Sequence, residues 1–345
     1  MTPSQPAPLT ASTPGIVRRD TVPAAGIVHL GLGNFHRAHQ AVYTDAAISA
    51  HGGDWGIIGV SNRSSAVTDA MHAQDMTYTV VEISPEGSTF STPRVHTDAF
   101  VAADDPDRVV AEIGAATTRI VSLTVTENGY TYSPATGSLN VADADVQHDL
   151  TQAAAPRTPI GQIVRGLQQR FRTHGEPVTV LSCDNLADNG HHTSRLVREF
   201  ASLLPAAEAA ETLQWIDANV TFPSSMVDRI VPATTDHYRT LVAEQRGYTD
   251  RIPVPAEPFT MWILEDNFIA GRPAWEAGGA VFTDDVAGYE QLKVRLLNGT
   301  HSLIAYLGAL SGAATIPDST AVDYIEAAAR SILRHEYLPS VTVPA

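Results

Sequence analysis

The sequence predicts an α/β protein in which a doubly wound, mostly parallel sheet is followed by an all-helical domain. Short apolar segments alternate with helix-compatible segments up to about residue 284. This alternation is typical of a parallel sheet whose two faces are covered by helices. Two glycines follow the first apolar segment directly, and long helical stretches without an obvious strand fill residues 285–345.

The predicted elements follow one another in a regular order. The first strand covers residues 26–30, and a helix over 35–50 follows it and ends at a pair of glycines. Further strands are predicted at 55–60, 77–83, 119–125 and 178–182, with helices at 107–115, 160–172, 289–310 and 320–336. The first residues are rich in Pro, Ser, Thr and Ala. We therefore divide the chain into a flexible arm (1–25), a dinucleotide-binding domain (26–284) and a helical domain (285–345).

Composition restricts the class of protein. The chain has 345 residues, is 43% hydrophobic and carries a formal net charge of -16. Such a surface repels nucleic acid and anionic membranes, so we expect a small molecule as the partner. Cys183 is the only cysteine, no apolar stretch approaches roughly 18 residues, and no secretion signal is visible. We expect a cytoplasmic protein; its oligomeric state stays open, and a monomer is compatible with the sequence.

Gly31 and Gly33 lie between the first predicted strand and the first predicted helix. A dinucleotide pyrophosphate binds at this position in Rossmann-type folds, against backbone N–H groups and the positive end of the helix dipole. The third glycine of the usual G-x-G-x-x-G pattern would fall on His36, so the motif is partial. The alternative is that the two glycines only make a tight turn for packing.

The end of the second predicted strand lacks the acidic residue that usually accepts hydrogen bonds from the adenosine ribose. Residues 61–65 read Ser-Asn-Arg-Ser-Ser instead. Hydroxyl groups and the Arg63 guanidinium suit a 2′-phosphate as well as a 2′-hydroxyl. The sequence therefore leaves the choice between NAD and NADP open.

A second candidate site lies in the helical domain. Lys293, Asn298 and His301 fall within an arc of about 140° if residues 289–310 form an α-helix. They border an apolar face, which can desolvate the lysine and lower its pKa toward neutrality, as proton transfer to and from an alcohol requires. The alternative is an ordinary solvated lysine beside a helix-capping asparagine.

Three polar residues stand out between these two sites. Asn185 follows the strand predicted at 178–182, at the edge where parallel sheets bind ligands, and its amide can donate to a developing alkoxide. We expect Asn189 to cap the helix that begins near His191. Asp228, beside Arg229 in an apolar setting, is either a buried ion-pair partner or an acceptor for a substrate hydroxyl.

Six segments together resemble the mannitol dehydrogenase family of polyol dehydrogenases and uronate reductases. In chain order they are GLGNFHRAHQAVYTD, VSLTVTENGY, SCDNLADNGH, TFPSSMVDRIVP, EPFTMWILEDNF and KVRLLNGTHSLIAYLG. The resemblance implies a Rossmann-type domain, NAD or NADP as the cofactor, and hydride transfer without a metal. It also implies that relatives continue into a larger helical domain, so we expect the helical domain here to be incomplete.

The resemblance also implies a role for individual residues. Lys293 would be the general acid and base, and Asn298 and Asn185 would flank the reacting oxygen. His301 would hold a substrate hydroxyl, Asp228 would orient the substrate or the lysine, and Glu290 would tune proton exchange with solvent. The residues implied for cofactor binding are Gly31, Gly33, Asn34, Phe35, Arg63 and Glu127.

The resemblance leaves several substrates open. Oxidation of mannitol to fructose comes first, reduction of fructuronate to mannonate second, and arabinitol third. Two other classes compete. A zinc enzyme would use ligands such as His36, His39, Asp184, His191 and His192, but H-E-x-x-H is absent from the sequence. The other is a protein that binds a dinucleotide without catalysis.

Overall fold

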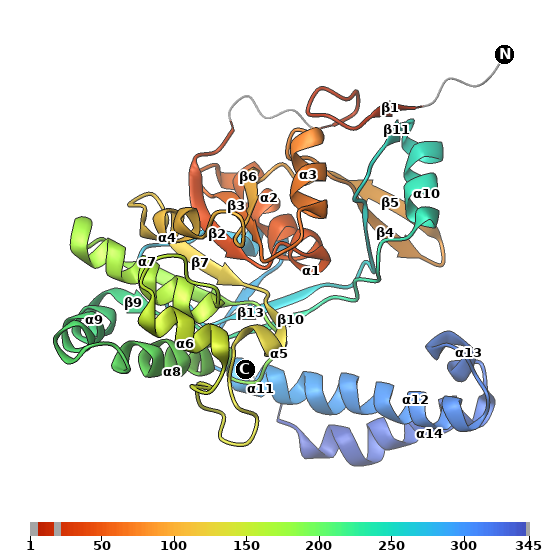
Figure 1. The fold of residues 1–345 in the computed structure, drawn as a ribbon. Helices are drawn as coiled ribbons and strands as arrows, with labels where there is room; N and C mark the ends of the chain where they lie inside the picture. Colours follow the sequence, from red (N-terminus) through yellow and green to blue (C-terminus); the bar gives the residue numbers. More distant parts are fainter. Residues whose placement is uncertain (1–5, 17–21, 343–345) are drawn as a thin grey trace. The chain divides into compact units, whose positions relative to one another are not determined.

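The computed structural model describes residues 6–16 and 22–342 (Figure 1). The chain divides into two compact units, Met1–Phe282 and Thr283–Ala345. The first unit is an α/β structure, and the second consists of helices.

A six-stranded sheet forms the centre of the first unit. Its strands, in spatial order, are β6 (His96–Val101), β3 (Gly56–Ser61), β2 (Ala25–Leu30), β7 (Ile120–Leu123), β8 (Val178–Ser182) and β9 (Val220–Thr221). All five neighbouring pairs are parallel. The chain adds strands outward on one side of β2 and then returns to its other side. This reversal between β2 and β7 is the topological switch point at which doubly wound sheets bind ligands.

Both faces of this sheet are buried, which explains why its strands are continuous apolar runs. Val28 and Val180 face a core shared with α4 (Pro106–Gly114), α7 (Pro159–Thr173), α8 (Asn189–Ser202) and α9 (Ala206–Asn219). Their neighbours Ile27 and Leu181 face a second core, which includes residues of α2 (Gln40–His51) and β13 (Met261–Leu264). Alternate residues of one strand thus serve opposite layers.

Two three-stranded sheets accompany the central sheet. One contains β12 (Val254–Ala256), β4 (Val80–Ser84) and β5 (Gly87–Ser91), and the other contains β10 (Ser225–Asp228), β13 and β14 (Val281–Phe282). The strand predicted at 77–83 therefore lies outside the central sheet. The remaining helices are α1 (Asn34–Ala38), α3 (Ala66–Ala73), α5 (Thr126–Gly129), α6 (Ala144–Thr151), α10 (Asp236–Arg246) and the 3-10 turn η1 (Trp275–Gly278).

The N-terminal segment is packed where a flexible arm was predicted. Strand β1 (Ala7–Pro8) pairs in parallel with β11 (Tyr248–Thr249), and Leu9 is completely buried in a cluster with Ile16 and Val242. The arm prediction is wrong for residues 6–16, because these apolar side chains have a core to enter. Residues 1–5 and 17–21 of the predicted arm lie outside the described residues.

The helix predicted at 35–50 is in fact two helices. His39 has a non-helical backbone (φ -119°, ψ -92°) and separates α1 from α2. The helix that follows the glycine turn is therefore only one turn long, so an extended helix dipole does not point at the turn as predicted.

The second unit begins with one long helical rod. It runs through α11 (Val286–Leu292), a π-helical segment η2 (Lys293–Asn298) and α12 (Gly299–Leu310), followed by α13 (Ile316–Thr320) and α14 (Asp323–Ile332). The N–H of Gly299 donates to the carbonyl of Val294, five residues back. The prediction of an uninterrupted α-helix over 289–310 is wrong at this segment. No helix within residues 6–16 and 22–342 is long and apolar enough to span a membrane.

Candidate functional site

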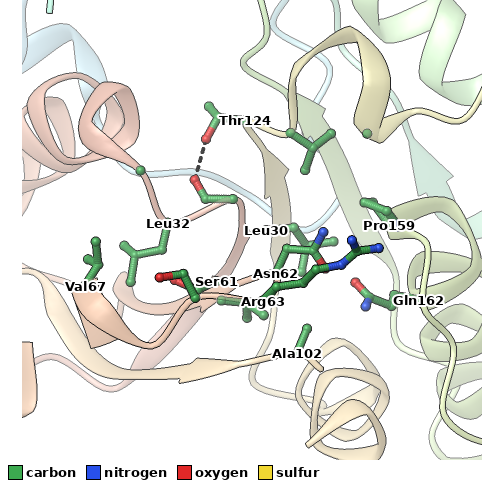
Figure 2. Close-up of a pocket in the computed structure, with 16 residues that line it drawn as sticks. Leu30, Leu32, Ser61, Asn62, Arg63, Val67, Ala102, Thr124, Pro159 and Gln162 are labelled. Carbon is green, nitrogen blue, oxygen red and sulfur yellow. Dashed lines mark hydrogen bonds between the residues drawn. The ribbon is translucent and has the colours of Figure 1, made fainter. Parts of the chain in front are cut away.

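A cavity of about 500 Å³ opens at the switch point of the central sheet (Figure 2). The carboxyl ends of β2, β3 and β7 contribute its walls. Of the predicted cofactor residues, Gly31, Gly33 and Arg63 line it, together with Asn62 and with Gln162 from α7. None of the described residues that line it is acidic, so the Arg63 guanidinium is its only formal charge.

The two glycines of the turn have different physical roles. Gly31 has φ +102°, and a Cβ there would overlap the carbonyl oxygen of Thr124. The Thr124 hydroxyl also donates to the Gly31 carbonyl at 2.8 Å, a bond drawn in Figure 2. A Cβ on Gly33 would meet only the Gly31 carbonyl oxygen, at 3.7 Å. Packing thus explains Gly31 but not Gly33, whose missing side chain leaves room for a ligand in the cavity.

An imidazole occupies the position of the missing third glycine. His36 stacks on His29 of β2 with ring centroids 3.5 Å apart, and its Nε2 lies 3.0 Å from Nε2 of His96. His29 is also bonded through Nδ1 to the Ser122 hydroxyl at 2.8 Å. Burial lowers the pKa of His29 and His96 to about 3, and burial and the neighbouring imidazoles hold the pKa of His36 well below its usual value. These three rings form an uncharged support beneath the turn.

Asp184 fixes the loop after β7, which forms another wall of the cavity. Its carboxylate accepts the N–H groups of Val125 and Thr126 at 3.0 and 2.9 Å and the hydroxyl of Tyr130 at 2.8 Å. Burial raises the pKa of Asp184, and these three bonds stabilise its charged form. From the sequence, Asp184 was predicted only as a possible metal ligand. Its position two residues after the end of β8 was the signal that it belongs to the ligand-binding edge.

Asn185 and Asn189 lie at the same edge but differ in burial. Asn185 follows β8 and is exposed. Asn189 is completely buried, and its amide donates to the carbonyls of Asp184 and Ser225 and accepts the Ser225 N–H at 2.9 Å. Asp188, and not Asn189, occupies the N-cap position of α8. The prediction of Asn189 as a helix cap is therefore wrong, since its side chain ties the end of β8 to β10.

Asp228 is the last residue of β10 and is half-buried. The adjacent Arg229 is buried and turns to other partners: it forms an ion pair with Glu82 and donates to the Glu257 carbonyl at 3.1 Å.

The other predicted cofactor residues lie around the cavity. Asn34 accepts a bond from the Arg37 guanidinium at 2.6 Å and donates to Thr234, while Phe35 stacks on His39 with centroids 4.9 Å apart. Glu127 is exposed on α5, between the cavity residues Val125 and Gly129.

The predicted proton-transfer residues lie on the long rod of the second unit. Lys293 and Asn298 are the first and last residues of the π-helical segment, and both are half-buried. A π turn takes more residues than an α turn. Lys293 and Asn298 therefore project from the helix at a smaller angle to each other than α-helical spacing predicted. Glu290 lies half-buried on α11, and His301 is exposed on α12. Single π turns inside α-helices are frequent at functional sites.

The histidines and acids considered as zinc ligands have separate partners. His36 contacts His96, His39 bonds to the Met261 carbonyl at 3.0 Å, and Asp184 holds the β7 loop. Across the part of the chain that the structure describes, no three His, Cys, Asp or Glu side chains gather as a metal-binding group.

The strand order, the glycine turn and the cavity at the switch point define a Rossmann-type α/β unit accompanied by a helical unit. The chain belongs to the mannitol dehydrogenase family. Residues 25–277 match the mannitol dehydrogenase Rossmann domain, and residues 285–345 match the mannitol dehydrogenase C-terminal domain.

Relatives and solved structures agree with this assignment. The chain is 39% identical over 323 residues to the D-mannonate oxidoreductase of Escherichia coli, which covers 92% of this chain and 65% of the relative. A Pseudomonas fluorescens mannitol 2-dehydrogenase, solved as a ternary complex with NAD and D-mannitol, superimposes with a TM-score of 0.84 at 39% identity, covering 94% of this chain and 65% of that one. A substrate-free D-sorbitol dehydrogenase gives a TM-score of 0.89 at 32% identity, covering 99% and 70%.

Proposed function

We propose that this chain is an NAD(P)-dependent oxidoreductase that interconverts a sugar alcohol and a ketose, with D-mannitol and D-fructose as the first candidate pair. The observation that carries the proposal is the cavity at the switch point, where Gly33 leaves space that the protein's own packing does not need. A dinucleotide is the ligand that Rossmann-type folds bind at this place. The structurally similar mannitol 2-dehydrogenase is described as a complex with NAD and D-mannitol.

A bound nicotinamide would accept hydride from the alcohol carbon or return it to the ketone. The residues of this chain supply proton transfer and charge stabilisation. Lys293 takes the hydroxyl proton on its Nζ during oxidation and returns it during reduction. The amides of Asn298 and Asn185 donate to the oxygen as it gains alkoxide character.

Three further residues act on the substrate or on the proton. His301 holds a substrate hydroxyl, Asp228 orients the substrate or the lysine, and Glu290, three residues before Lys293, tunes proton exchange with solvent. The π-helical segment supports these assignments because it begins at Lys293 and ends at Asn298. This local irregularity in a long helix coincides with the two residues that the chemistry needs most.

Reduction of D-fructuronate to D-mannonate is the second candidate reaction. Its support is the 39% identity to a D-mannonate oxidoreductase over 92% of this chain. Oxidation of D-arabinitol is the third candidate. A dinucleotide-binding protein without catalysis is the competing proposal from another class.

A reduction panel separates these candidates. Fructose, fructuronate, tagaturonate and xylulose are each offered with NADH and with NADPH, while dinucleotide binding is measured by titration on the same protein. Preferred turnover of fructose supports the first candidate, and preferred turnover of fructuronate selects the second. Binding of the dinucleotide without reduction of any of these four substrates would instead select the non-catalytic protein.

A further inference from the structure

The adenosine end of the cavity carries positive charge where an NAD site usually carries a carboxylate. A second cavity of about 390 Å³ shares Asn62, Arg63 and Gln162 with the first, and it extends toward Arg157 and Asp145. Two guanidinium groups and one carboxylate therefore line the second cavity, together with His148. On a chain with a net charge of -16, this is a local reversal of sign.

Strand β3 places Asn62 and Arg63 where the adenosine ribose of a dinucleotide lies in a doubly wound sheet. β3 is the second strand of the central sheet in chain order. In Rossmann-type folds the residue at the carboxyl end of this strand distinguishes a ribose 2′-hydroxyl from a 2′-phosphate. Strand β3 ends at Ser61, which is buried, and the exposed residues Asn62, Arg63 and Ser64 follow it. A carboxylate at this point repels a phosphate, whereas this segment offers a guanidinium, an amide and a hydroxyl.

The Arg63 side chain is available to a ligand. It is 78% exposed, and its contact with Asp145 is long, at 3.7 Å between Nη2 and Oδ2. Exposed ion pairs of this kind contribute at most about 1 kcal/mol. Asp145 also keeps a shorter partner in Arg157, at 3.2 Å. A phosphate dianion can therefore draw Arg63 away from Asp145 at little cost.

From these observations, and on the basis of the dinucleotide site proposed above, we infer that this chain binds NADP(H) more tightly than NAD(H), with Arg63 as the residue that binds the 2′-phosphate. Ser64 and Asn62 supply additional hydrogen bonds. The same hydroxyl and amide can bond to a ribose 2′-hydroxyl, so NAD is also accepted.

Binding of adenosine fragments tests the inference without any turnover. Calorimetric titration of the full chain compares 2′,5′-ADP with 5′-AMP, which differ only by the 2′-phosphate. We expect 2′,5′-ADP to bind about 10- to 100-fold more tightly, as one charge-assisted hydrogen-bonded pair provides. Arg63→Gln should bring the two affinities together, and Asp145→Asn, which releases the arginines, should widen the difference.

Arg198→Gln is the matched control, since Arg198 is also in an ion pair with one carboxylate, that of Asp217, but lines neither cavity. It should leave both affinities unchanged. If NAD and 5′-AMP bind and the 2′-phosphate adds no affinity, or if Arg63→Gln keeps the difference, the inference is overturned and the proposed reaction stands. If neither fragment nor either dinucleotide binds, the proposed dinucleotide site falls as well.

Discussion

The imidazoles of His29 and His36 lie face to face, with ring centroids 3.5 Å apart and planes inclined by 16°. In most dinucleotide-binding turns, a third glycine at the position of His36 allows the helix to approach the strand closely. Here the stacked rings of His29 and His36 fill the space between strand and helix, and His96 bonds to His36. The support of the glycine turn thus depends on three neutral histidines.

This support should make the protein sensitive to acid. The pKa values of the three histidines are lowered in the folded state, to about 3 for His29 and His96. Their stabilising contribution is therefore complete above the unfolded pKa of 6.5 and is lost as the pH falls toward 3. Below pH 6.5 we expect a loss of up to roughly 1 kcal/mol per pH unit for each histidine. Urea unfolding between pH 7.5 and 5 measures it.

A variant isolates this contribution from that of other groups. The pKa values of Asp184 and Asp250 are raised by burial, so these carboxyl groups act with the opposite sign. His96→Phe keeps a buried ring and removes one titrating group. Below pH 6.5, its free energy of unfolding should fall less steeply than that of the unchanged protein, by up to roughly 1 kcal/mol per pH unit. Equal dependence in the two proteins would show that the histidines do not carry the effect.

The two glycines of the turn should respond differently to alanine. Gly31→Ala places a Cβ on the Thr124 carbonyl at φ +102°, and we expect a loss of about 2 kcal/mol or more in the free energy of unfolding. Gly33→Ala meets no such contact. It should keep its stability within about 0.5 kcal/mol and weaken dinucleotide binding by about 10-fold or more. Dinucleotide affinity that is unchanged in Gly33→Ala would contradict the placement of the ligand at this turn.

Alanine at Asn189 should lower stability, whereas alanine at Asn185 should lower activity. Asn189→Ala leaves the Ser225 N–H and the Asp184 and Ser225 carbonyls without the amide, and should cost about 2–4 kcal/mol in urea unfolding. Asn185→Ala changes an exposed residue, so we expect its stability to stay within about 0.5 kcal/mol and its turnover to fall on the order of 100-fold. The opposite pattern would exchange the roles assigned to the two asparagines.

The fold could be predicted because the hydrophobic pattern of the central strands is unambiguous. The strand predicted at 178–182 is confirmed residue for residue as β8. It was identifiable because it is buried on both faces and so is a continuous apolar run. The strand predicted at 77–83 was recognisable in itself. It forms a hairpin with β5, which follows it directly, but its other partner, β12, lies far along the chain, and local pattern does not specify such pairing.

The details that sequence reasoning missed depend on tertiary contacts. Asn189 has the residue type of a helix cap, but the backbone N–H and carbonyl of Ser225 on β10 bond to its amide instead. The break at His39 coincides with its contacts to Phe35 and the Met261 carbonyl. The π-helical segment that begins at Lys293 could not be recognised from the sequence, because the spacing of its apolar residues fits an α-helix as well. The types of the candidate site residues were therefore visible in the sequence, whereas their local geometry was not.

One measurement tests the proposed role of Lys293 in proton transfer most directly. Turnover of the preferred substrate is compared at neutral pH for the unchanged chain, Lys293→Ala and the control Gln291→Ala, an exposed position two residues earlier. Dinucleotide affinity is titrated in parallel. We predict that Lys293→Ala lowers turnover by about 100- to 10,000-fold while the dinucleotide Kd changes by less than about twofold, and that Gln291→Ala changes neither. Retained turnover in Lys293→Ala at neutral pH would contradict the assignment of Lys293 as the proton-transferring group.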